Sequence, residues 1–97
     1  MQRDEAIRLI KDSLPELARR FGIRTISIFG STARNEASAA SDVDILADFG
    51  RAPAFDDYMD VKFFLEDLLH AKVDLVTPAG LRPPLRPIIE HEAVRVA

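Results

Sequence analysis

The sequence predicts an α/β domain of the α+β type, in which helices flank a small mixed sheet of three or four strands. Two patterns of apolar residues support this prediction. Apolar residues spaced by three and four are typical of amphipathic helices, and short apolar runs that end at Gly or Pro are typical of strands. The two patterns alternate along the chain. Because its 97 residues contain no internal repeat or linker, we expect a single domain over residues 1–97.

A long amphipathic helix is expected at the N-terminus. Apolar residues recur with helical spacing over residues 3–20, and Gly22 follows as a residue that commonly ends a helix. Pro15 lies inside this segment and removes a backbone hydrogen-bond donor, so we expect it to kink or split the helix.

A strand, a short helix and a loop are expected next. Residues 26–29 form an apolar run that Gly30 ends, and Ser31 is expected to cap a short helix over residues 31–37. The Ser/Ala/Asn-rich stretch over residues 35–41 is expected to be a loop that joins this helix to the following strand.

The second half is predicted to contain a helix between two strands, followed by a tail. An apolar pattern of period two starts at Val43 and ends near Gly50, and Pro53 is expected to open a helix with a wide apolar face. The remaining segments are expected to be a third strand over residues 73–76, a proline-rich stretch over residues 78–87, a helical turn at residues 88–90 and a strand over residues 94–96.

Three aspartates lie on the predicted strands. Asp42 and Asp44 are two residues apart, so both side chains are expected to leave the same face of one strand. Neighbouring carboxylates repel each other unless a cation lies between them, and Mg²⁺ prefers such oxygen ligands together with phosphate oxygens. Asp74 is the only acid of the third strand and could complete a site for two metal ions if that strand neighbours the second.

The turn at Gly30 and Ser31 is a candidate phosphate-binding element. Gly30 permits a tight turn and the close approach of a ligand, while Ser31 offers a hydroxyl and a backbone amide at a helix N-terminus. Arg34 follows one helical turn later, where it could bind a triphosphate or pair with an acid. A Gly-Ser turn alone is usually structural, but its combination with the acid pair favours a site for phosphoryl-type transfer.

The runs Gly-Ser-Thr-Ala-Arg at residues 30–34 and Ser-Asp-Val-Asp at residues 41–44 resemble the signature of the minimal nucleotidyltransferases, small members of the DNA polymerase β-like superfamily. In that signature a third Asp lies on a later strand, where this sequence has Asp74. The leading helix and the ending over residues 89–94 also look like the family.

The resemblance implies Mg²⁺-dependent transfer of AMP from ATP to a hydroxyl group. It also implies an antitoxin whose partner, a HEPN-domain toxin, supplies a tyrosine hydroxyl as the acceptor, because this short chain has little room for an acceptor-binding domain. Two Mg²⁺ ions are expected. By match to the family motif, the catalytic and metal-binding residues would be Asp42, Asp44 and Asp74, and the nucleotide-binding residues would be Gly30, Ser31, Arg34 and Ser41.

Two other functions stay open at this point. The chain could neutralise a toxin by forming a complex, with acids that no longer act in catalysis, or it could transfer a nucleotide to a small molecule. An intact acid motif disfavours the first, because a protein that only binds gains nothing from three mutually repelling carboxylates. A measurement of Mg²⁺-dependent ATP binding would separate an enzyme from a binding protein.

The composition limits the classes of partner. The net charge is −3 and the basic residues are scattered, which disfavours direct binding of nucleic acid. Because the chain has no cysteine, disulfides and thiolate metal sites are excluded. The charged N-terminus resembles no signal peptide and no apolar run is long enough to cross a bilayer, so we expect a cytoplasmic protein that does not contact membranes.

Overall fold

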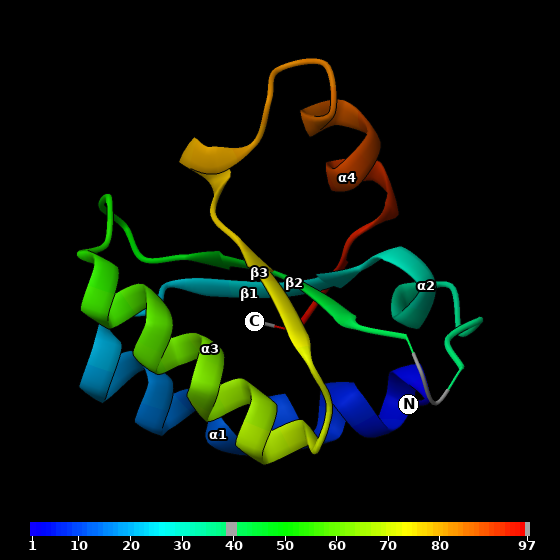
Figure 1. Ribbon diagram of the computed structural model, residues 1–97, viewed down its shortest axis with the longest axis horizontal. Coiled ribbons are helices and arrows are strands. Elements are labelled where there is room, and N and C mark those ends of the chain that lie inside the picture. The colour runs from blue at the N-terminus through cyan, green and yellow to red at the C-terminus, as the bar shows by residue number, and fades with distance from the viewer. Residues whose placement is uncertain (39–40, 97) are drawn as a thin grey trace.

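The structure is a computed structural model that describes residues 1–38 and 41–96, in which two helices cover one face of a sheet (Figure 1). The predicted α+β class and the mixed sheet of four strands are confirmed. Part of the predicted loop over residues 35–41 lies outside the described residues. In chain order the elements are α1 (Arg3–Phe21), β1 (Thr25–Phe29), α2 (Gly30–Ala33), β2 (Val43–Asp48), α3 (Phe55–Leu69), β3 (Val73–Val76), the 3-10 turn η1 (Pro78–Gly80), α4 (Arg86–Glu92) and β4 (Val94–Arg95).

The sheet has the strand order β3-β2-β1-β4. Strand β1 is antiparallel to both β2 and β4, whereas β2 and β3 are parallel and are joined through α3. Phe29 at the end of β1 pairs with Asp44 of β2, and Asp44 pairs in turn with Asp74 of β3. The third strand therefore neighbours the second, as a cluster of three acids requires.

The core fills the space between the sheet and the pair α1 and α3, which lie together below the sheet in Figure 1. Along β2 the buried residues Val43, Ile45 and Ala47 alternate with half-buried ones, so one face of the strand is apolar and the other carries Asp44. Burying each aliphatic side chain contributes roughly 1.5–3 kcal/mol, which makes this face the main source of stability. No helix in the described part of the chain is long and apolar enough to span a membrane.

The helix boundaries differ from the sequence predictions at three places. Pro15 does not split α1, because its side chain is exposed on a helix that stays continuous over 19 residues. Ser31 does not cap α2, because that helix begins at Gly30 and ends at Ala33, so Ser31 lies inside it. Pro53 does not open α3, which begins at Phe55. The prediction that Gly22 ends α1 is confirmed, since Gly22 is left-handed and its N–H bonds to Ala18.

Two side chains of α3 bond to the outer edge of β3. The carboxylate of Glu66 accepts a hydrogen bond from the Val73 N–H at 3.0 Å, and the hydroxyl of Tyr58 donates one to the Leu75 carbonyl. Strand β3 is at the end of the sheet, so these backbone groups have no neighbouring strand on that side. The helix thus supplies polar partners that the sheet does not.

Thr32 of α2 is fully buried, and within the described residues its Oγ1 has no hydrogen-bond partner. An unpaired buried hydroxyl costs about 1–3 kcal/mol. We expect Thr32→Val, which keeps the branched shape and removes the hydroxyl, to raise the free energy of unfolding by about 1 kcal/mol and the Tm by about 4–8 °C. Thermal unfolding followed by circular dichroism measures this change.

Thr77→Val is the matched control for this substitution. The Oγ1 of Thr77 accepts a hydrogen bond from the Gly80 N–H at 3.3 Å, so its loss should lower the Tm. A lower Tm for Thr32→Val as well would show that the Thr32 hydroxyl has a partner, such as a buried water, and would contradict the prediction.

Candidate active site

The turn between β1 and α2 lies against the acid of the neighbouring strand. Gly30 has a left-handed φ of 70°, and a Cβ built on it would overlap Asp44 Oδ2 and lie 3.0 Å from Asp44 Cγ. Only glycine fits this position, for both conformational and steric reasons. The Gly-Ser turn and the acid pair, separated in sequence, are therefore in direct contact.

The three aspartates lie close together on the face of the sheet opposite α1 and α3. Asp44 and Asp74 are register partners on parallel strands, and Asp42 precedes β2 by one residue rather than lying within it. Burial raises the pKa of Asp44, and the charges of Asp74 and Asp42 raise it further. Asp42 and Asp74 are themselves exposed. The cluster therefore combines one half-buried carboxylate with two that face solvent.

The donor set of this cluster suits a hard cation, because it consists of carboxylate oxygens whose mutual repulsion a divalent ion would relieve. As arranged, no group of three or more His, Cys, Asp or Glu side chains among the described residues could hold a metal ion. Asp42 and Asp74 are exposed, so both side chains have room to turn toward Asp44 when a cation and phosphate oxygens arrive.

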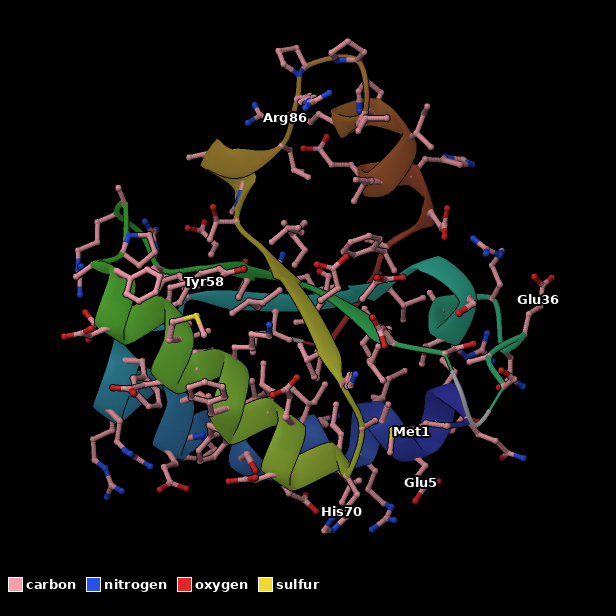
Figure 2. All side chains as sticks on the ribbon, in the orientation of Figure 1. Met1, Glu5, Glu36, Tyr58, His70 and Arg86 are labelled. Atoms are coloured by element: carbon pink, nitrogen blue, oxygen red, sulfur yellow. The ribbon has the colours of Figure 1, made fainter. Side chains whose placement is uncertain are left out.

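Arg34 pairs with acids on both sides. Its Nε bonds to Glu36 at 3.1 Å, on the loop after α2 (Figure 2), and its Nη1 bonds to Glu92 at the end of α4. The hydrogen bond to Glu36 and the charge of Glu92 raise the pKa of Arg34, which keeps the guanidinium charged. The charge of Asp44 acts in the same direction.

Glu92 was missed by the sequence predictions. It is 58 residues from Arg34 in the chain, and although it lies in the family-like ending over residues 89–94, nothing in the sequence shows that it rather than Glu90 pairs with Arg34. Its charge also raises the pKa of Asp44 slightly, so it belongs to the surroundings of the cluster. Next to it is a shallow, open depression of about 610 Å³, which is lined by Arg34, Pro87, Ile88, His91 and Glu92.

Among the described residues, no hydrogen bond links Ser41 to the three aspartates. Its hydroxyl accepts a hydrogen bond from the Ser38 N–H at 3.1 Å, and its N–H donates one to the Ser38 carbonyl at 3.1 Å. These two bonds close a local turn. Its expected role in nucleotide binding therefore stays a prediction.

Tyr58, labelled on α3 in Figure 2, is a second residue near the cluster that the sequence predictions did not include in the site. Burial raises its pKa, and the charge of Asp74 raises it further. Because its hydroxyl bonds to the carbonyl of Leu75, the residue after Asp74, it fixes the strand that carries this acid.

Comparisons with known proteins agree with this geometry. Residues 8–96 match the nucleotidyltransferase domain family. The protein adenylyltransferase MntA of Thermococcus cleftensis is 42% identical over 81 residues, which cover 84% of this chain and 82% of that protein. A solved minimal nucleotidyltransferase superposes with a TM-score of 0.81 at 36% identity, over 97% of this chain and 95% of the other.

A more distant solved structure shares the fold. It is a chain from the complex of a tri-AMPylated HEPN toxin of Shewanella oneidensis with its MNT antitoxin, with a TM-score of 0.62 and 19% identity. The similarity covers 98% of this chain and 68% of that chain.

The raised pKa of Asp44 predicts how stability depends on pH. Folding strengthens proton binding at Asp44, so the free energy of unfolding falls as the pH rises from the ordinary Asp range through the raised pKa. In metal-free buffer at pH 7 we expect Asp74→Asn, which removes one of the repelling charges, to raise the Tm by a few degrees. The gain should shrink below about pH 4, where carboxyl groups are protonated.

Thermal unfolding at neutral and acidic pH measures this difference. Asp67→Asn, which removes an exposed acid of α3 outside the cluster, should leave the Tm nearly unchanged at both. If Asp74→Asn and Asp67→Asn behaved alike at neutral pH, repulsion between Asp74 and Asp44 would not be a cost of folding.

Proposed function

The chain belongs to the nucleotidyltransferase domain family and is a nucleotidyltransferase, and we propose that it transfers AMP from ATP to a hydroxyl group on a partner protein. The observation that carries this proposal is the contact between Gly30 and Asp44. It places a turn that can bind phosphate directly against Asp44, the half-buried carboxylate toward which the exposed side chains of Asp42 and Asp74 could turn to bind a cation. The similarity to a protein adenylyltransferase supports AMP as the transferred group.

Each residue has a defined part in this proposal. The backbone at Gly30 and Ser31 binds the triphosphate, and Arg34 adds a charged donor to it. Asp42, Asp44 and Asp74 would hold two Mg²⁺ ions. When bound, such ions neutralise the phosphates and stabilise the charge that develops on the attacking and leaving oxygens.

The proposed transfer step leaves the acceptor with an AMP group. The acceptor oxygen forms a bond to the α-phosphorus of ATP, the bond from that phosphorus to the bridging oxygen breaks, and pyrophosphate leaves. Asp74 accepts the proton of the acceptor hydroxyl. Its side chain is exposed on an end strand of the sheet, so a hydroxyl carried by another protein can reach it.

We further propose that the partner is a HEPN-domain toxin, that its acceptor is a tyrosine, and that the chain acts as its antitoxin. The support is the MntA relative and the fold shared with a chain from the complex of an MNT antitoxin with a HEPN toxin. A protein that neutralised the toxin by binding alone would have no use for the repulsion around Asp44.

The test is transfer of label from α-labelled ATP to a purified HEPN-domain protein, taken from the gene neighbouring this one where it encodes such a protein, with Mg²⁺ present. We expect Asp42→Asn/Asp44→Asn to lose about 100-fold or more of the transfer rate, because both carboxylates next to the reacting phosphate are gone. Asp67→Asn is the matched control and should transfer at the wild-type rate.

Three results would contradict the proposal. Wild-type protein that transfers no label to any protein or small molecule would remove the enzymatic function. A double variant that still neutralises the toxin as well as wild type does would show that complex formation is sufficient, and label found only on a small molecule would identify a different acceptor.

A further inference from the structure

Polar side-chain contacts link both ends of helix α4 to other parts of the protein. None of its residues is buried, and it lies on the side of the sheet away from α1 and α3 (Figure 1). At its start, Arg86 donates a hydrogen bond to the Pro78 carbonyl at 2.7 Å, and at its end Glu92 pairs with Arg34. The side chain of Glu92 is 26% exposed, against 60% for Glu90 on the same helix.

The guanidinium of Arg34 is fixed at two of its three nitrogens. Glu36 accepts a hydrogen bond from Nε and Glu92 accepts one from Nη1, while Nη2 has no hydrogen-bond partner among the described residues. Because the guanidinium is a rigid plane, two fixed nitrogens determine the direction of the third. The two N–H groups of Nη2 are thus left for another acceptor.

We propose that Glu92 is a positioning residue of the nucleotide site: it holds Arg34 so that Nη2 is free to bind a phosphate oxygen of ATP. This inference rests on the proposed function and extends the site to the C-terminal tail. A long side chain that is ordered before the ligand arrives loses less entropy on binding, so the ligand binds more tightly.

A negative charge beside a phosphate site also has an opposite effect, which is repulsion. Arg34 is about half exposed, so solvent screens the interaction between Glu92 and a bound phosphate. The arginine fork can serve a carboxylate and a phosphate at the same time through different nitrogens. We therefore expect the ordering of Arg34 to outweigh the repulsion.

The experiment measures the affinity for ATP with Mg²⁺ by calorimetry, and KM and kcat for AMP transfer, in single and double variants. We expect Glu92→Ala to weaken ATP binding and raise KM about tenfold with kcat changed less than about twofold. Glu92→Gln keeps an oxygen that accepts from Arg34 and should lose no more than about threefold. Glu90→Ala, on the exposed side of the same helix, is the matched control.

The decisive arm is the double variant Arg34→Ala/Glu92→Ala. If Glu92 acts through Arg34, its removal should weaken ATP binding less than about twofold further once Arg34 is already absent. A full additional loss would show that Glu92 acts by another route, and tighter binding by Glu92→Ala would show that it competes with the nucleotide. Either result overturns the inference.

Failure of the inference and failure of the proposed function give different results. Wild-type protein that binds ATP with Glu92→Ala unchanged contradicts only the role of Glu92. Wild-type protein that binds no ATP overturns both. If Glu92→Ala has a much lower Tm than Glu90→Ala, Glu92→Met replaces it, because Met keeps most of the side-chain length and loses both carboxylate oxygens. ATP binding by folded Glu92→Met as tight as that of wild type would overturn the inference.

Discussion

The contact between Gly30 and Asp44 is the constraint on which the site depends. Strand β1 delivers Gly30 directly after Phe29, and Phe29 is the register partner of Asp44, so pairing of the two strands brings the turn and the acid together. The same contact excludes a side chain at residue 30, since a Cβ would overlap the carboxylate. The register of β1 against β2 therefore also sets the geometry of the site.

The two faces of the sheet differ in composition: one carries the apolar core and the other carries the acid cluster. On the face toward α1 and α3, apolar residues of every long strand form the core. On the other face, Asp44 is partly removed from water and surrounded by like charges, which disfavours folding. A core of this size offsets such a cost. Unfavourable local electrostatics of this kind are common at functional sites.

The fold and the centre of the site could be predicted because their signals are local. Gly30, Asp42 and Asp44 lie within one short motif, and apolar periodicity located α1, α3 and the first three strands. The exact ends of α2 and α3 were wrong because caps depend on backbone geometry, which no side-chain preference at Ser31 or at a proline determines.

The role of the tail could not be predicted, for a physical reason. Whether Glu92 or its exposed neighbour Glu90 faces Arg34 depends on how α4 is turned against α2, and α4 has no buried residue whose spacing would reveal its inner side. Contacts between charged side chains distant in sequence leave no periodic pattern. Ser41 is the opposite example: the sequence motif predicts that it binds the nucleotide, whereas in the structure its side chain bonds within a local turn.

The contacts that α3 makes with β3 bear on self-association. An end strand with free backbone groups invites another chain to extend the sheet, which leads to aggregation or to dimers that share a continuous sheet. Here Glu66 and Tyr58 already occupy the N–H of Val73 and the carbonyl of Leu75. An added strand would have to displace both side chains, so this edge resists intermolecular β-pairing while leaving Asp74 exposed.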